Sequence, residues 1–271
     1  MPAAPASELP LPRFAALLRE YRGARRLSQL ELSAASGVSQ RHLSFLETGR
    51  ARPGREVVLR LAAALGLPHR AADELLTAAG FPPLTPAAPP AEAAALVERA
   101  LRLYLDLHEP FPAVAADRCW EVRAANRAFE RLVQALGNAR WNPGRPGGIN
   151  LLRAALHPAG IRPFIANWDE IAAETWRRAA ADALEPGGSD LRAVLAELEA
   201  HVPAVLRQPA RARPLLPILP VRLATPVGVL SLISVVATFG TAQDALAEDL
   251  RIEAFIPADA ATEAFFRAAA G

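Results

Sequence analysis

A short run of residues in the N-terminal third carries side chains suited to reading the base edges of double-stranded DNA. Residues 40–47 read QRHLSFLE, and Leu43 and Leu46 lie at helical spacing, as expected for a buried stripe. The opposite face would hold Gln40, Arg41, Ser44 and Phe45. Amide and guanidinium groups pair with purine edges in the major groove, so this face predicts direct contact with bases.

Basic residues follow this run directly. Arg50 and Arg52 come after Gly49, which would end the helix, so they lie on a loop from which they would reach phosphates. Residues 1–80 contain 11 arginines and 7 acidic residues, a net charge of +4, whereas the remainder has 19 basic and 21 acidic residues, a net charge of −2. The small basic part therefore suits a polyanion, and the larger part suits a different partner.

A second set of candidate residues lies further along the chain and is large and apolar. Its members are Trp120, Phe129, Phe164, Trp168, Ile171 and Trp176. If their elements converge on a sheet, they would line an apolar pocket in which Asn167 or Arg153 orients a polar head group. The same residues would also make an ordinary core, so both interpretations stay open.

The residue types that catalysis and metal binding need are poorly arranged. The five histidines have no paired metal spacing, and there is no Gly-rich nucleotide loop or nucleophile motif. Cys119 stands alone, which excludes an intramolecular disulfide. We expect no enzyme activity, no metal and no cofactor apart from a bound apolar effector. No apolar run is long enough for a bilayer and no secretory signal is evident, so we expect a cytoplasmic protein without membrane contact.

The base-reading face needs a helical scaffold, and local signals predict one. Ser28 and Glu31 have the spacing of a capping box at the start of a helix, and Gly37 is placed to end it. Ser39 is a good N-cap for the next helix. With a helix before them and two after, these elements predict a five-helix unit.

The segment SQLELSAASGVSQRHLSFLETGRARP resembles the Xre family of lambda-repressor-like helix-turn-helix proteins. The matching positions are Gln29, Leu32, Gly37, Val38, Ser39, Leu43, Ser44, Glu47, Gly49 and Pro53. The resemblance implies that Gln29 and Ser39 touch the DNA backbone, whereas Gln40, Arg41 and Ser44 face bases. Phe45 stands where a polar residue is commoner, so base preference does not transfer. We expect Glu47 to be a structural residue.

A proline-rich stretch divides the chain. Residues 81–91 read FPPLTPAAPPA, and five prolines favour an extended linker over a helix. We therefore predict a helix-turn-helix domain at 1–80, a linker at 81–91 and a second domain at 92–271. The predicted helix at 92–108 is apolar on two stripes, which indicates two partners: its own domain and a second subunit.

The second domain mixes helices and strands. Residues 111–133 read as strand, turn, strand and a helix capped by Asn126, the opening of a PAS-like sensor fold. Helices are predicted at 149–156, 162–184 and 190–206, and strands at 215–224, 227–239 and 250–256, the last half-buried. The expected fold class is α+β: an all-helical N-terminal domain and a PAS-like domain with an antiparallel sheet covered by helices.

This half resembles the MmyB-like ligand-binding domain of regulators with such a helix-turn-helix. The motifs are Trp120 with Asn126-Arg127-Ala128, INLLRAALHPAG, ANWDEIA, ATFGTAQD and LRIEAFIPADAAT. The resemblance implies a pocket for an apolar, fatty-acid-like molecule. We thus expect a transcription factor, acting as a homodimer on double-stranded DNA, that senses a small apolar ligand. The alternative is a constitutive repressor whose second domain serves only dimerisation or protein contacts.

Overall fold

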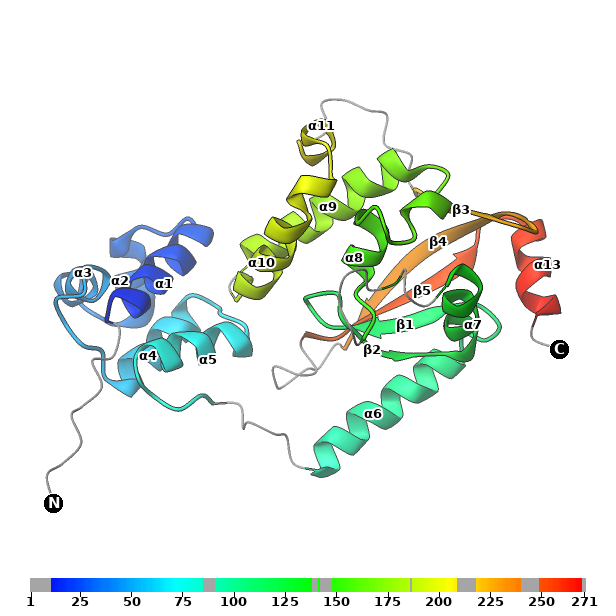
Figure 1. Ribbon diagram of the computed structural model, residues 1–271. Helices are drawn as coiled ribbons and strands as arrows, with labels where there is room; N and C mark the ends of the chain where they lie inside the picture. Colours follow the sequence, from blue (N-terminus) through cyan, green and yellow to red (C-terminus); the bar gives the residue numbers. More distant parts are fainter. Residues whose placement is uncertain are drawn as a thin grey trace, which may run out of the picture. The chain divides into compact units, whose positions relative to one another are not determined.

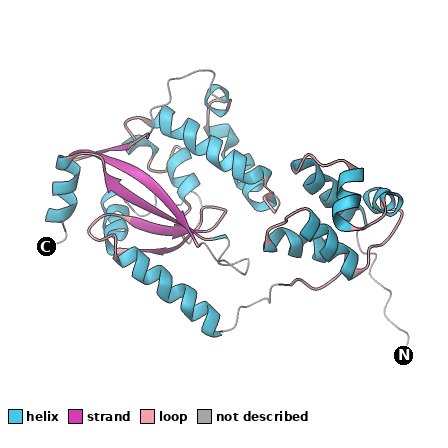
Figure 2. Cartoon of the chain, turned by 180° about the vertical axis from the view of Figure 1, so that it is seen from behind, coloured by secondary structure: helices cyan, strands magenta, loops and turns pink. Residues whose placement is uncertain are grey.

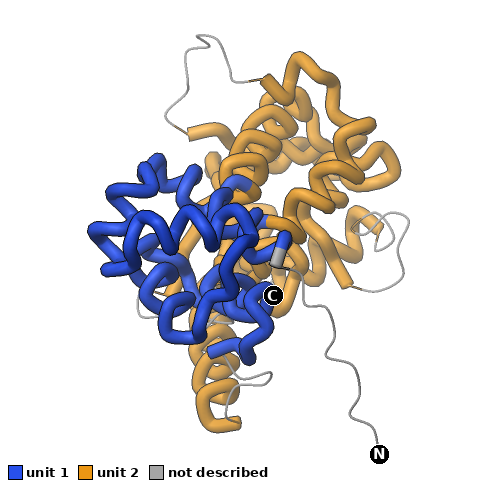
Figure 3. Tube along the Cα trace, turned by 90° about the vertical axis from the view of Figure 1, so that its left-hand side faces the viewer, with its two compact units in different colours: residues 1–89, 184–188, 242–248 blue, residues 90–183, 189–241, 249–271 orange. Residues whose placement is uncertain are grey.

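The computed structural model describes residues 11–84, 91–137, 141, 148–185, 187–208, 218–239 and 249–269. The chain forms two compact units, which Figure 3 colours separately. The first comprises residues 1–89 with the segments 184–188 and 242–248, and the second comprises the rest. Residues 85–90 of the predicted linker lie outside the described residues.

The first unit is helical throughout its described part. Its helices are α1 (Leu11–Ala24), α2 (Gln29–Ser36), α3 (Gln40–Glu47), α4 (Arg55–Ala64) and α5 (His69–Ala78) (Figure 1). They enclose one apolar core, to which Phe14, Leu43 and Leu61 contribute fully buried side chains. The predicted five-helix unit is confirmed.

The local signals at α2 and α3 act as predicted. The Ser28 hydroxyl accepts from the backbone N–H of Glu31, and the Glu31 carboxylate accepts from the backbone N–H of Ser28 at 2.7 Å, which completes the capping box. Gly37 ends α2 with φ at +67°, a conformation that costs glycine little. Ser39 then caps α3 through the N–H of His42. Together these contacts fix the turn between the two helices.

The second unit is built on an antiparallel sheet. Its strands are β1 (Ala113–Ala116), β2 (Val122–Ala125), β3 (Val221–Thr225), β4 (Gly228–Thr238) and β5 (Arg251–Pro257). Their order is β2-β1-β5-β4-β3, and each neighbouring pair is antiparallel (Figure 2). The fold class predicted from the sequence, α+β with a PAS-like second domain, is confirmed.

One face of the sheet carries helix α6 (Ala91–Asp106). Leu101 and Leu105 of α6 pack with Ala113 and Ala115 of β1 and with neighbouring side chains of β5. The small alanines let the helix approach the strand closely. This cluster is separate from the larger core on the other face.

The opposite face carries the larger core. The covering helices are α7 (Arg127–Leu136), α8 (Leu151–Leu156), α9 (Trp168–Leu184) and α10 (Ser189–Leu198), followed by the short η3 (Glu199–His201) and α11 (Ala204–Arg207). α13 (Ala260–Ala268) adds Phe266 to the same core. Asn126 caps α7 as predicted and is itself buried, with its amide also bonded to Phe111 O at 2.8 Å.

Three sequence predictions need correction. The strand at 250–256 is not half-buried: Ile252 and Ala254 face the α6 cluster while Phe255 packs in the larger core, so helices cover both sides. Ile256 departs from the predicted buried stripe and is exposed. The strand predicted at 215–224 begins only at Val221, and residues 209–217 lie outside the described part.

The predicted helix at 162–184 is broken. Arg162–Phe164 form the 3-10 turn η2, and α9 begins at Trp168. Between them Ile165 pairs with Leu223 of β3, and Ala166 N donates to Arg222 O at 2.8 Å. The backbone here bonds to the sheet instead of continuing the helix. The predicted helix at 190–206 likewise ends at Leu198, with α11 starting only after Pro203.

Candidate DNA-binding face and aromatic core

The outer face of α3 holds the predicted base-reading residues. Gln40 and Arg41 are exposed, whereas Ser44 and Phe45 are half-buried. The guanidinium carbon of Arg41 lies 5.6 Å from the centre of the Phe45 ring, one helical turn further on. Phe45 is therefore less outward than predicted, and its ring restricts the directions in which Arg41 points.

The predicted phosphate contacts flank α3. Ser39 lies at its N-terminus as the cap, and Arg50 and Arg52 are exposed beyond its C-terminus. Arg50 N donates to Phe45 O at 2.8 Å, and Gly49 has φ at +70°, so the backbone that carries the two arginines turns sharply at a defined point. The face thus presents exposed arginine side chains on the helix and on the loop after it.

Glu47 anchors this face from below. Its side chain is 2% exposed and accepts from Arg22 Nε at 2.6 Å, from Arg22 Nη2 at 2.9 Å and from Gln29 Nε2 at 2.7 Å. Burial alone would raise the pKa of Glu47, but the hydrogen bonds from Arg22 and Gln29 hold the pKa below its ordinary value. The structural role predicted for Glu47 is confirmed, and the amide of Gln29 is partly engaged by it.

The six apolar residues predicted to line a pocket come together in one cluster. Trp120, Phe129, Trp168 and Ile171 are buried members, and Phe164 and Trp176 pack against them partly exposed. They come from the loop between β1 and β2, from α7, from η2 and from α9. The structure therefore brings the set to one face of the sheet, as expected.

Three tryptophans of this cluster have an arginine over their ring. The guanidinium carbon lies 3.5 Å from the ring centre for Arg162 on Trp168, 5.0 Å for Arg178 on Trp120 and 5.7 Å for Arg207 on Trp176. Such cation–π contacts stabilise the rings and place positive charge around the apolar cluster.

Asn167 has a role at the sheet edge. Its Nδ2 donates to Pro220 O at 2.9 Å, and its Oδ1 accepts from Arg222 N at 3.0 Å. Both ends of the amide are thus bonded to the residues around the start of β3. This contact pins the start of α9 to the sheet, while the head-group role expected for Asn167 stays a prediction.

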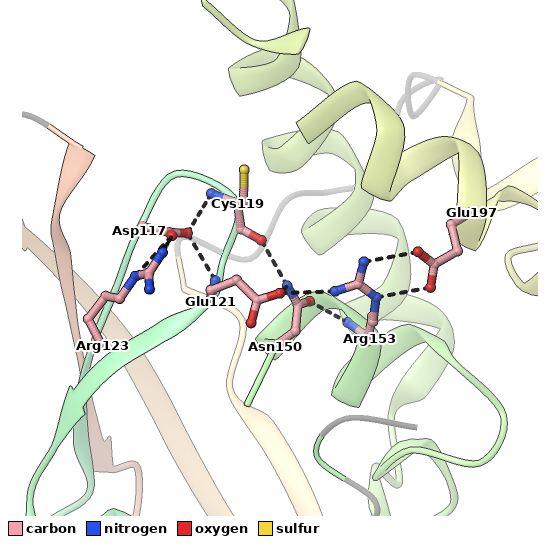
Figure 4. A network of polar contacts seen from close by, with 7 residues as sticks. All are labelled: Asp117, Cys119, Glu121, Arg123, Asn150, Arg153 and Glu197. Atoms are coloured by element: carbon pink, nitrogen blue, oxygen red, sulfur yellow. Dashed lines mark hydrogen bonds and ion pairs between the residues drawn. The ribbon is translucent and has the colours of Figure 1, made fainter. Parts of the chain in front are cut away.

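Arg153 lies at the centre of a polar network (Figure 4). Its guanidinium pairs with both oxygens of Glu197 at 2.9 Å each and with Glu121 at 3.0 Å, and its side chain is 3% exposed. Asn150, fully buried, caps α8 through Arg153 N and also donates to Glu121. Arg153 therefore links α8, α10 and the start of β2. With these partners it acts first as a structural residue, and its head-group role stays a prediction.

Sequence reasoning missed Trp141. Its ring is 4% exposed and lies 5.3 Å from the Phe129 ring, edge to face, and Phe129 in turn stacks on Phe255 at 6.4 Å. The indole Nε1 of Trp141 is buried and has no hydrogen-bond partner. A tryptophan alone within the Pro- and Gly-rich run NARWNPGRPGG was the signal available in the sequence.

The described residues contain no group of three or more histidine, cysteine, aspartate or glutamate side chains arranged to hold a metal ion. A separate search of the same residues finds no helix with the length and apolarity to cross a membrane.

A helix-turn-helix unit joined to a PAS-like α+β domain defines a class of protein, the DNA-binding transcription regulators with a ligand-binding domain. The chain belongs to the family of MmyB-like transcription regulators. The family model described as "MmyB-like transcription regulator ligand binding domain" matches residues 97–269, and a helix-turn-helix family model matches residues 18–71. Both describe regulator domains, and the absence of catalysis stays a prediction.

Among solved structures, the chain is similar to one titled "Structure of an RNA-binding Light-Oxygen-Voltage Receptor", with 14% identity and a TM-score of 0.28. The match covers 95% of this chain and 61% of that chain, so this chain spans about three fifths of that receptor's length. No curated protein matches the chain.

Proposed function

We propose that this regulator binds an apolar, fatty-acid-like molecule within the aromatic cluster of its second domain, and that the bound molecule changes its affinity for operator DNA. The observation that carries the ligand proposal is the unpaired indole N–H of Trp141 within an aromatic surrounding. Leaving such a buried donor without a partner costs about 1–3 kcal/mol, which an oxygen of a bound molecule would recover. The apolar surroundings select an aliphatic body for that molecule.

The DNA side of the proposal rests on α3. Exposed Gln40 and Arg41, with Ser44 beside them, would enter the major groove, while Gln29, Ser39, Arg50 and Arg52 would hold phosphates. We further propose that the protein acts in the cytoplasm as a homodimer on a two-fold operator, with half-sites about 34–36 Å or a multiple apart.

Arg41→Ala and Arg52→Ala are expected to differ in kind. Loss of a base-reading arginine should cost about 1–3 kcal/mol and relax sequence preference at one position, whereas loss of a phosphate contact should weaken all sequences alike and lower the salt slope by about one. Selection of binding sites from a random pool, followed by salt titration, measures both. Unchanged preference for Arg41→Ala with altered preference for Arg52→Ala would reverse the assignment.

Trp141→Phe tests the ligand site. Phenylalanine keeps an aromatic ring but removes the N–H, so we expect thermal stability without ligand to stay the same while the response to ligand weakens about tenfold, the value of one hydrogen bond. The measurement is operator binding titrated with laurate, myristate and palmitate. Trp168→Phe is the matched control, because the Trp168 indole already donates to Ala155 O at 2.9 Å and its loss should lower stability.

Extraction of the purified protein with organic solvent, followed by mass spectrometry, identifies a resident molecule. If nothing stoichiometric is extracted and none of the three fatty acids changes operator affinity, the sensor proposal fails. The second domain would then serve dimerisation or protein contact alone.

A further inference from the structure

Helix α6 keeps an apolar stripe that the sheet does not cover. Leu96, Leu103 and Leu107 are 69%, 58% and 81% exposed, whereas Leu101 and Leu105 on another side of the helix are buried against the sheet. A row of exposed leucines on one helix indicates a partner surface, since a lone soluble domain gains nothing from it.

The stripe has the spacing of a coiled-coil seam. Leu96, Ala100, Leu103 and Leu107 follow at intervals of four, three and four residues, which is the alternation of the a and d positions in a heptad. In that frame Arg99 and Asp106 both occupy g positions beside the seam. They flank the same side of the stripe and carry opposite charges.

We propose that a second copy of this chain covers the stripe, with the two α6 helices antiparallel. In the register that pairs Leu96 with Leu107 of the partner subunit, Ala100 faces Leu103 of the partner subunit, so a small side chain meets a large one at the centre. The same register brings Arg99 to Asp106 of the partner subunit, and the two-fold axis repeats this ion pair. The inference rests on the proposed homodimer and specifies its interface.

Charge favours this orientation. A parallel pairing would place each g position beside an e position, so that Arg99 would face Tyr104 of the partner subunit and gain no opposite charge. An open hollow beside the stripe, lined by Ala95, Glu98, Arg99, Arg102 and Leu103, lies where Asp106 of the partner subunit would enter. Positive charge in that hollow complements the incoming carboxylate.

Charge reversal on the full chain tests the interface. Arg99→Asp and Asp106→Arg are each expected to raise the dimer dissociation constant about tenfold or more in sedimentation velocity, because like charges then meet twice. The double variant Arg99→Asp/Asp106→Arg should restore wild-type dimerisation. Far-UV circular dichroism confirms that each variant is folded. Leu107→Asp should abolish dimerisation in the same assay.

Spin labels measure the orientation. With Cys119→Ala to remove the native thiol, labels at Glu92→Cys should lie about 28 Å apart along the axis in the antiparallel pair and about 10 Å apart in a parallel one. A short distance overturns the antiparallel interface, as does a wild-type dimer that neither reversal weakens. In the latter case the proposed homodimer survives without this interface. A wild-type chain that stays monomeric at tens of micromolar overturns both.

Discussion

Replacing Glu47 with alanine should lower the free energy of unfolding of the helix-turn-helix unit by about 3 kcal/mol, the lower end for breaking a buried ion pair. The value sits at that end because Arg22 is partly exposed and regains water. Both Arg22 and Gln29 lose their shared acceptor, so α1, α2 and α3 lose the contact that joins them. Operator binding should weaken in parallel.

The experiment uses the full chain, with probes that separate the units. All four tryptophans lie in the second unit, so their fluorescence should follow denaturation there and stay unchanged. Hydrogen exchange of the α2 and α3 amides should accelerate in the variant. Glu56→Ala, at an exposed position in the first turn of α4, is the control and should change little. Equal exchange in the wild type and Glu47→Ala would contradict the prediction.

The same carboxylate predicts a pH dependence. The pKa of Glu47 in the folded chain lies below its ordinary value of 4.5, so its contribution is fully present above that value and is lost as pH falls through the folded pKa. The stability difference between wild type and Glu47→Ala should therefore shrink below about pH 4.5.

Arg153→Met should destabilise the second unit by about 3 kcal/mol, because it removes the charged hydrogen bonds to Glu121 and Glu197 while keeping an apolar stem. The two carboxylates are about one third exposed and regain water, which keeps the loss at the lower end. Urea denaturation followed by tryptophan fluorescence measures it.

Arg177→Met is the matched control, since Arg177 pairs with Glu174 on the surface of the same unit and should contribute less than about 1 kcal/mol. The experiment also separates the two interpretations of Arg153. A variant as stable as wild type that no longer responds to fatty acid would support the head-group role predicted from the sequence and contradict the structural one.

The first unit was predictable in detail because its boundaries depend on local signals. Ser28, Glu31, Gly37 and Ser39 each act on groups within four residues, so their effect can be read from neighbouring letters. The partners of Glu47 could not be predicted in this way. Arg22 lies 25 residues away and Gln29 lies 18 away, and only the packing of three helices brings them together.

The second unit shows the same division. The cap at Asn126 and the apolar cluster followed from residue type and spacing. The break before α9 did not, because its cause is the pairing of Ile165 with Leu223, which lies on a strand far along the chain. A helical pattern in the sequence carries no information about a distant sheet edge that competes for the same backbone groups. Trp141 was missed because no periodic pattern surrounds it.

Strands β1 and β5 separate the aromatic cluster from α6 by a single layer of backbone. Val114 and Phe255 face the cluster, and Ala113, Ala115 and Ile252 face α6. We therefore expect effector binding and subunit association to be linked equilibria. By thermodynamic reciprocity, the factor by which an effector changes the dimer constant is the factor by which dimerisation changes affinity for that effector. The concentration of the regulator in a cell would then set its sensitivity to the effector, as well as its occupancy of DNA.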